Sequence, residues 1–437
     1  MLGKMSRRSS WVFTFLIVIL GVAVFGFLAG AGEAEARKLK ILCTTDLSGP
    51  LATFGASYDR ALKLAIADIE KVGIKGFDGI DYKIVDDEGK PSTMQRKLQR
   101  EAETWKPDIV VGAVWEPTIR VWCSELPKYK IPGYVGGHQG MSKHMGEGPV
   151  PLTGWVMYYG FPEYYSGYLG GKTLHDLGAK RVAFMAADYD WGWGQSQGLL
   201  GYWLDNGKPF EIIMIGYTPP DKSDYTTETL LIKEAKADGM YCPYTGAGWW
   251  TLPKALRDAQ AMPAHFVYEC SYGNQGQARI SGEYGAEGVY TVADHDPTRP
   301  EWAEFVKKWQ AAYGEKSFPE MYTSNYYQAT WWAAKAFEQI GPDNKDPDRA
   351  LQILHQTSFQ NVNVGPMGPL DEWGGNVSAK GSVIRFVKGA SELDPNFGLH
   401  EELIKVYDLP KWNSKELLEK MSKMPKLERG QKYEAAQ

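Results

Sequence analysis

The feature of this sequence that most limits its fold is an alternation of short hydrophobic runs with helix-length amphipathic segments, which occurs in two successive series. The short runs are rich in β-branched and aromatic residues, as buried strands are, and the intervening segments have the length of crossover helices. Such alternation is typical of a parallel sheet covered by helices. The sequence therefore predicts an α/β protein with two doubly wound parallel-sheet lobes.

The two series can be placed along the chain. The first contains predicted strands at residues 40–45, 82–86, 108–113 and 132–135, with helices near 57–72, 92–105 and 117–129. The second contains predicted strands at 181–187, 211–216, 239–243 and 265–270, with helices near 164–177, 195–206, 225–237 and 252–261. A further strand is predicted at 288–293. A chain of 437 residues has room for two or three domains, which agrees with two lobes.

The N-terminus has the pattern of a secretory signal peptide. Lys4, Arg7 and Arg8 precede an apolar run at 11–32, and Ala34-Glu35-Ala36 supplies the small residues that signal peptidase requires. We expect cleavage after Ala36, which would release a periplasmic protein. The alternative is an uncleaved anchor, because residues 11–28 are long enough to span a bilayer.

Composition and charge exclude several classes of function. Hydrophobic residues make up 43% and charged residues 23%, as in ordinary globular proteins. The net charge is −5 and basic residues are scattered, so nucleic acid is not an expected partner. The charged segment 409–437 is expected to be a tail that frays, with one short helix near 414–424.

The four cysteines and seven histidines do not suggest a metal site or a cofactor. They show none of the spacings typical of zinc ligands, so neither a metal nor a cofactor is expected. Cys242 and Cys270 fall in neighbouring predicted strands, where a disulfide is possible only if register and side-chain direction agree. We favour free thiols at both positions.

Gly194-Gln-Ser-Gln-Gly198 matches the motif that carries the nucleophile of many hydrolases. That chemistry requires the serine on a sharp turn directly after a strand. Here a loop separates the strand from Ser196, which we expect to lie inside a helix. A secreted serine hydrolase that uses Ser196 is therefore the weakest of the functions considered.

The loops that follow the predicted strands are the better candidates for a site, because open α/β sheets bind ligands at the carboxyl ends of their strands. Three of these loops carry tryptophan, although tryptophan is often a packing residue. The candidate binding residues in these loops are Phe54, Trp115, Glu116, Gly137, His138, Gln139, Trp191, Tyr244, Trp249 and Glu269.

At this point the chain resembles a known family, the type I periplasmic solute-binding proteins of the branched-chain amino acid uptake class. The resemblance rests on the order and spacing of short motifs over nearly all of the mature chain. These are Leu47-Ser-Gly-Pro-Leu-Ala-Thr-Phe-Gly55, Asp86-Asp-Glu88, Asp188-Tyr-Asp-Trp-Gly192, Ala255-Leu-Arg-Asp-Ala259, Glu287-Gly-Val289 and Met367-Gly-Pro-Leu370.

The resemblance implies two lobes joined by a three-crossing hinge, and a solute trapped between the lobes for delivery to an ABC permease in the inner membrane. The crossings are expected near residues 154–163, 289–294 and 367–373. This would make 37–157 and 292–368 the first lobe, and 158–291 and 369–408 the second. The resemblance implies a monomer, and a binding protein rather than an enzyme. A ligand-sensing subunit that reports to a receptor or kinase would have the same fold.

The resemblance also assigns roles to the candidate residues. Amino-acid binders of this family hold the ligand carboxylate with hydroxyls from turns that here read Trp115-Glu-Pro-Thr118 and Gly136-Gly-His-Gln139, so an aliphatic amino acid is a poor fit. Glu269 would hold a ligand ammonium group. Phe54, Trp191 and Trp249 fall at aromatic walls, which suit a flat aromatic solute or an organic cation. The expected solute is an amino-acid-like, amide or aromatic compound.

Overall fold

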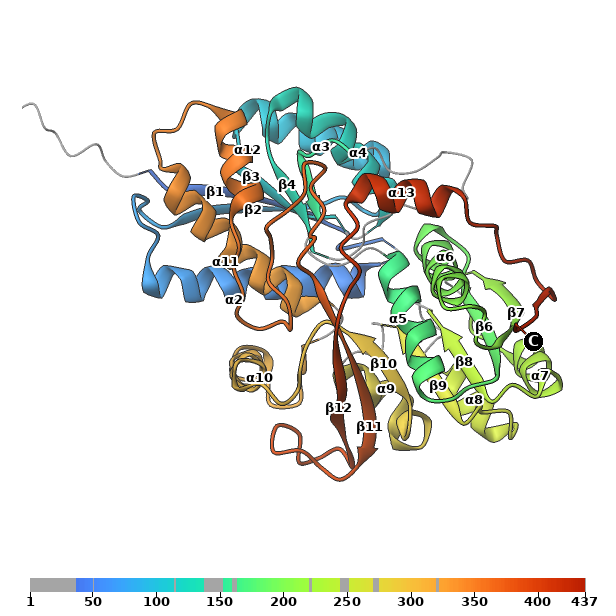
Figure 1. The fold of residues 1–437 in the computed structure, drawn as a ribbon. Coiled ribbons are helices and arrows are strands. Elements are labelled where there is room, and N and C mark those ends of the chain that lie inside the picture. The colour runs from blue at the N-terminus through green and yellow to red at the C-terminus, as the bar shows by residue number, and fades with distance from the viewer. Residues whose placement is uncertain are drawn as a thin grey trace, which may run out of the picture.

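The computed structural model describes residues 37–436, except residues 50, 114, 137–151, 159–162, 220–221, 244–250, 270–274 and 320–321. Two mainly parallel sheets, each covered by helices on both faces, form two lobes side by side (Figure 1). The α/β fold with two doubly wound lobes is therefore confirmed.

The first lobe has a five-stranded parallel sheet in the order β2-β1-β3-β4-β5. Its strands are β1 (Leu39–Thr45), β2 (Ile80–Asp86), β3 (Ile109–Gly112), β4 (Gly133–Val135) and β5 (Val156–Tyr158). One core packs against α2 (Ala52–Val72), α10 (Pro300–Tyr313), α11 (Thr323–Ile340) and α12 (Pro347–Gln356). The core on the other face contains α3 (Pro91–Thr104) and α4 (Glu116–Tyr129).

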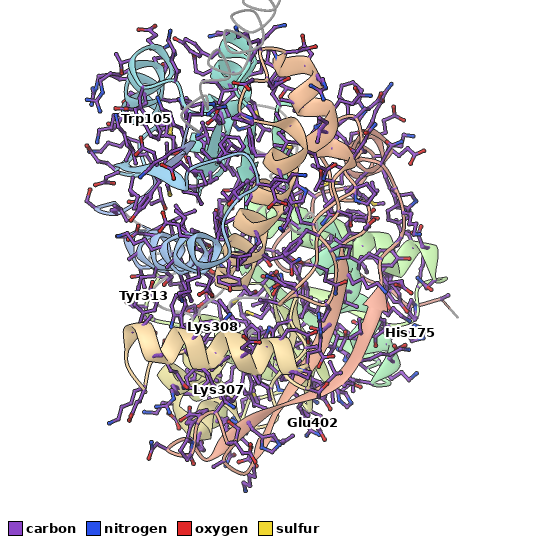
Figure 2. All side chains as sticks on the ribbon, turned by 90° about the vertical axis from the view of Figure 1, so that its left-hand side faces the viewer. Trp105, His175, Lys307, Lys308, Tyr313 and Glu402 are labelled. Carbon is purple, nitrogen blue, oxygen red and sulfur yellow. The ribbon has the colours of Figure 1, made fainter. Side chains whose placement is uncertain are left out.

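Helix α10 belongs to the first lobe although it follows a strand of the second. Lys308 on α10 pairs with Asp68 on α2 at 3.1 Å, and the hydroxyl of Tyr313 donates to the carbonyl of Arg60. Figure 2 shows Lys308 and Tyr313 on the side of α10 that faces α2. These contacts fix the point at which the chain re-enters the first lobe.

The second lobe has an eight-stranded sheet in the order β12-β11-β10-β9-β8-β6-β7-β13. Its parallel strands are β6 (Arg181–Ala187), β7 (Glu211–Thr218), β8 (Gly239–Cys242), β9 (His265–Glu269) and β10 (Tyr290–Ala293). Its antiparallel strands are β11 (Lys380–Lys388), β12 (Leu399–Asp408) and β13 (Lys432–Tyr433). The predicted parallel strands agree with the structure, whereas the antiparallel edges were not predicted.

Helices cover both faces of the second sheet. One core contains α5 (Glu163–Asp176), α6 (Asp190–Asp205) and α13 (Ser414–Ser422). The other contains α7 (Thr226–Ala235), α8 (Leu252–Asp258) and α9 (Gln275–Ala286). The chain passes between lobes after β5, after β10, and between Leu370 and β11, which agrees with the predicted three crossings.

The expectation that the C-terminal segment frays is wrong. Leu417 and Met421 of α13, together with Leu427, are buried in the core of the second lobe. Beyond them, β13 pairs with β7 at the edge of the second sheet. The charged residues that suggested a tail occupy the outer face, while the apolar residues between them anchor the segment.

Replacing Asn413 by Ala should destabilise the protein by about 1 kcal/mol. Asn413 caps α13: its side chain accepts from the amide of Glu416, and the Glu416 carboxylate accepts from the amide of Asn413. Chemical denaturation measures the loss, with Lys415→Ala as an exposed control on the same helix. Equal stability of both variants would mean that the Asn413 cap does not stabilise the protein.

Candidate functional site

The first lobe contributes Glu116 and Arg120, both on α4. The helix begins directly after the loop that follows β3, with Trp115 as its extended N-cap residue and Pro117 in its first turn. Proline is favoured there because the first-turn amides have no partner inside the helix. This start places the Glu116 and Arg120 side chains one turn apart, at the carboxyl-terminal edge of the first sheet.

The second lobe contributes three carboxylates from three different elements. Glu163 is the first residue of α5, Asp190 is the first residue of α6, and Glu269 is the last residue of β9. Asp190 follows β6 through a short loop, and Tyr189 is its extended N-cap. The carboxyl ends of parallel strands meet at one edge of a sheet, which brings Asp190 and Glu269 towards the first lobe. Glu163 instead begins the helix that follows β5 of the first lobe.

The two lobes meet at these residues. The guanidinium of Arg120 lies 3.4 Å from the carboxylate of Asp190, which is an ion pair between the lobes. We call Glu116, Glu163, Asp190 and Glu269 the carboxylate cluster. Each of the four is at most 3% exposed. Arg120 contacts this cluster through its ion pair with Asp190, and its charge also acts on Glu116.

Burial and neighbouring negative charges both raise pKa values in the carboxylate cluster. Burial and the neighbouring Asp190 raise the pKa of Glu116 to about 8, and Arg120 only partly offsets this. Burial, followed by the charges of Glu116, Asp190 and Glu269, holds the pKa of Glu163 well above its usual range. Glu116 and Glu163 therefore hold their protons more tightly than an exposed glutamate does.

Aromatic rings border the carboxylate cluster. Burial and the charges of Glu116, Glu269 and Glu163 hold the pKa of Tyr189 well above its ordinary value, and Tyr58 of α2 adds to this effect. The ring of Tyr189 stacks on Trp191 with centroids 6.1 Å apart. The site therefore combines negative charge with aromatic faces.

The structure describes five of the ten predicted site residues. Glu116 and Glu269 belong to the carboxylate cluster, and Trp115 is the partly exposed N-cap of α4. Trp191 stacks on Tyr189 and packs in the hydrophobic core of the second lobe. Phe54 packs in the hydrophobic core of the first lobe. The other five lie outside the described residues: Gly137, His138, Gln139, Tyr244 and Trp249.

Sequence reasoning missed Arg120, Glu163, Asp190 and Tyr189. Asp190 and Tyr189 stand in the motif Asp188-Tyr-Asp-Trp-Gly192, so they could have been nominated with Trp191. Glu163 and Arg120 had no comparable signal, because each looks like an ordinary helix residue until the lobes are placed together. The order of elements could indicate a shared edge, but not which side chains meet across it.

Ser196 lies inside α6, as predicted, and is fully buried. Its hydroxyl donates to the carbonyl of Trp193 at 2.7 Å and accepts from the hydroxyl of Tyr217 at 2.8 Å. Neither partner is a base that could activate it, so this environment is structural. Cys242 is a buried free thiol, as expected, and Cys270 lies outside the described residues.

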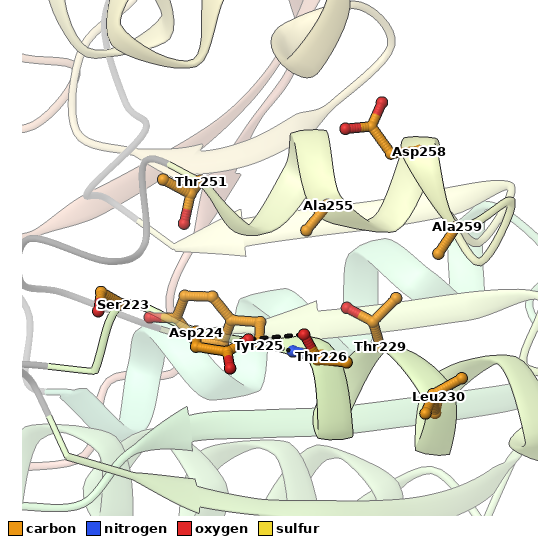
Figure 3. Close-up of a pocket in the computed structure, with 10 residues that line it drawn as sticks. All are labelled: Ser223, Asp224, Tyr225, Thr226, Thr229, Leu230, Thr251, Ala255, Asp258 and Ala259. Carbon is orange, nitrogen blue, oxygen red and sulfur yellow. Dashed lines mark hydrogen bonds between the residues drawn. The ribbon is translucent and has the colours of Figure 1, made fainter.

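A pocket of about 440 Å³ lies between α7 and α8 of the second lobe (Figure 3). Several of its polar groups bond to one another: the amide and hydroxyl of Thr226 both donate to Asp224. All of its lining residues belong to the second lobe. Relative motion of the lobes would therefore not enclose a ligand in this pocket.

In the described part of the chain, no group of His, Cys, Asp and Glu is arranged to hold a metal ion. Within the same residues, no helix combines the length and hydrophobicity that a membrane span requires.

Several solved structures of solute-binding proteins share this fold. A solute-binding protein of an ABC transporter from R. palustris, in complex with benzoate, has a TM-score of 0.71 and 18% identity, and the match covers 87% of this chain and 98% of that one. The leucine binding protein LivK from Thermotoga maritima MSB8 has a TM-score of 0.66 and 16% identity, and the match covers 85% of this chain and 99% of that one. LivJ from Streptococcus pneumoniae, in complex with isoleucine, has a TM-score of 0.67 and 15% identity, and the match covers 86% of this chain and 100% of that one.

None of the curated proteins matches this sequence significantly. A family model described as "Periplasmic binding protein" matches residues 38–388, which is most of the chain. The prediction of a binding protein rather than an enzyme is thereby confirmed. The chain belongs to the periplasmic binding protein family.

Proposed function

We propose that this chain is the periplasmic substrate-binding protein of an ABC importer, which captures a small organic solute between its lobes by hinge closure. The observation that carries the proposal is the meeting of buried charged side chains from both lobes, where Arg120 of α4 pairs with Asp190 of α6. A site divided between two lobes is shielded from water only when the lobes close. The membrane partner is the importer's permease, and the binding protein acts as a monomer.

The structural neighbours support a small organic solute. The R. palustris protein was solved with benzoate and the S. pneumoniae protein with isoleucine. In this chain, Trp115 from the first lobe and Trp191 from the second are the described candidates for walls that contact the solute. Each lobe would supply one aromatic surface, so both would be needed for full affinity.

The proposed lobes are 37–157 with 292–368, and 158–291 with 369–408. Residues 409–436 pack on the second lobe through α13 and β13. Export would follow removal of residues 1–36 after Ala36. N-terminal sequencing of the exported protein should then begin at Arg37, and a mature protein that begins at Met1 would contradict this location.

Mass spectrometry of the protein purified from its native periplasm tests the proposed function. Under native conditions, we expect a mass excess that corresponds to one small organic molecule per chain. Denaturation should release this molecule. A protein that has been unfolded, dialysed and refolded provides the empty control. A purified protein with no retained solute, and no response to any solute in a broad screen, would contradict the proposal.

A further inference from the structure

The chain continues past the stretch that the periplasmic binding protein model matches, which ends at residue 388. Residues 409–436, which we call the C-terminal segment, include α13 and β13. Figure 1 shows this segment in red, with α13 near α6 and the end of the chain, marked C, beside β7. The segment is held by one lobe and touches the other, as its contacts show.

The C-terminal segment is attached to the second lobe along its length. Trp412 stacks on Tyr165 of α5 with ring centroids 5.8 Å apart, and the amide of Trp412 donates to the Tyr165 hydroxyl at 3.3 Å. Lys420 of α13 pairs with Asp205 of α6 at 2.8 Å. Beyond α13, β13 pairs with β7. The segment therefore moves with the second lobe when the lobes rotate.

The third crossing between the lobes contains a tight turn, Asp371–Gly375, which we call the hinge turn. It follows Leu370, which is buried in the core of the first lobe. The amide of Tyr158 in β5 donates to the carbonyl of Gly374 at 2.8 Å, so the turn lies along the edge strand of the first sheet. One oxygen of Asp371, Oδ1, accepts from two amides within the turn, at 3.0 and 2.8 Å. The hinge turn is therefore held by the first lobe.

The C-terminal segment and the hinge turn meet at the start of α13. The amide of Ser414, the first residue of α13, donates to Oδ2 of Asp371 at 2.6 Å. Amides in the first turn of a helix lack partners within the helix, and a carboxylate is favoured there. The approach is close, because a Cβ atom at Gly375 would be 2.1 Å from the hydroxyl oxygen of Ser414. A carboxylate held by the first lobe thus caps a helix of the second.

We propose that the C-terminal segment limits how far the lobes open, because it ties the hinge turn to the second lobe through Asp371 and Ser414. Rotation that carries the hinge turn away from α13 would break the hydrogen bond between them. A hydrogen bond to a charged group changes an equilibrium by roughly tenfold or more, so wide opening is disfavoured. This inference rests on the proposed hinge motion, although it does not depend on which solute is bound.

The described arrangement links the lobes at two levels. Arg120 and Asp190 pair across the carboxylate cluster, whereas Asp371 and Ser414 pair at the third crossing. The link at the crossing does not involve the site, so it can persist in the empty protein. The lobes then have fewer orientations to give up when a solute closes them, which lowers the entropic cost of binding.

Replacing Ser414 by Pro tests the link, because it removes the amide hydrogen that Asp371 accepts. Proline is favoured in the first turn of a helix, and Asn413 before it has the extended backbone that proline requires, with φ −70° and ψ 163°. Small-angle X-ray scattering of the refolded, empty protein should give a larger radius of gyration for Ser414→Pro than for the wild type. Hydrogen exchange at the amides of Trp373 and Gly375 should be roughly tenfold faster, because Asp371 is held less firmly.

Two further variants separate this hydrogen bond from other effects. Ser414→Ala keeps the amide and loses only the hydroxyl, so its radius of gyration and hydrogen exchange should match the wild type. Asp371→Asn acts from the other side: one oxygen can still accept from the turn amides, but the other becomes an NH2 group that cannot accept. It should open the empty protein as Ser414→Pro does, and it decides the question if Ser414→Pro fails to fold. Circular dichroism shows which variants are folded.

Equal radii of gyration for the wild type and for the folded, empty Ser414→Pro and Asp371→Asn proteins would overturn the inference. A Ser414→Ala protein as open as Ser414→Pro would overturn it as well, since the amide would not be the tie. Neither result bears on the proposed function, because no solute is present in these measurements. Failure to find a retained solute would contradict the proposed function and would leave this comparison of empty variants unaffected.

Discussion

Replacing Gly198 by Ala should destabilise the second lobe by about 3 kcal/mol. Gly198 lies where α6 crosses α5, and a Cβ atom there would be 1.9 Å from the carbonyl oxygen of Tyr164. The same helix pair has a second close approach, because a Cβ at Gly167 of α5 would be 1.9 Å from the carbonyl of Gln195. These obstacles are backbone atoms, so the helices would have to separate.

Guanidinium denaturation followed by far-ultraviolet circular dichroism measures this loss. Gly207→Ala is the control, because it lies just beyond α6, has a positive φ of 69° and has no atom within 4 Å of the added Cβ. It should cost about 1 kcal/mol, from backbone strain alone. If Gly198→Ala costs no more than this control, α5 and α6 do not pack as closely as described.

Replacing Glu116 by Gln should change how stability depends on pH. The pKa of Glu116 is about 8 in the folded protein, against an ordinary value of 4.5. Between these pH values the unfolded chain releases the proton while the folded protein keeps it, so the contribution of Glu116 to stability falls as pH rises. The variant lacks this loss of stability. Above pH 8, its free energy of unfolding should exceed that of the wild type by at most about 5 kcal/mol.

Thermal and chemical denaturation of the empty protein from pH 4 to pH 9 measures the difference. Glu125→Gln should behave in the opposite way. Although burial opposes the effect, hydrogen bonds from Lys128, Gln99 and Gln95 lower the pKa of Glu125. Its ionised form therefore stabilises the fold above the ordinary pKa, and the variant should be less stable than the wild type at neutral pH. A Glu116→Gln protein whose stability parallels the wild type at every pH would show that Glu116 is not in a dry, acidic environment.

Most of the parallel strands could be predicted because they are buried on both faces and therefore read as continuous hydrophobic runs. The same reasoning explains what was missed. In β12, charged residues occupy the exposed positions of an edge strand, so its pattern resembles a surface segment. In β5, three residues within an aromatic, glycine- and proline-containing stretch are too few to show a strand period. The C-terminal segment was wrongly predicted to fray because its charged residues outnumber the apolar residues that anchor it.

The site was predicted less completely than the fold. Glu116, Trp191 and Glu269 could be nominated because each lies at or beyond the carboxyl end of a predicted strand, where α/β proteins bind ligands. Arg120 and Glu163 could not, since their importance depends on how the two lobes meet. The contact between Arg120 and Asp190 joins residues 70 positions apart, in separate lobes, and no local pattern encodes it.

Closure of the lobes on a solute is the central claim, and small-angle X-ray scattering tests it most directly. Scattering would be recorded from the refolded, empty protein and again after addition of the solute released from the native preparation, at saturation. We predict a smaller radius of gyration with solute, because a molecule that contacts both lobes favours the closed state. An unchanged radius of gyration, with saturation shown by calorimetry and with the empty protein shown to be open, would contradict the account.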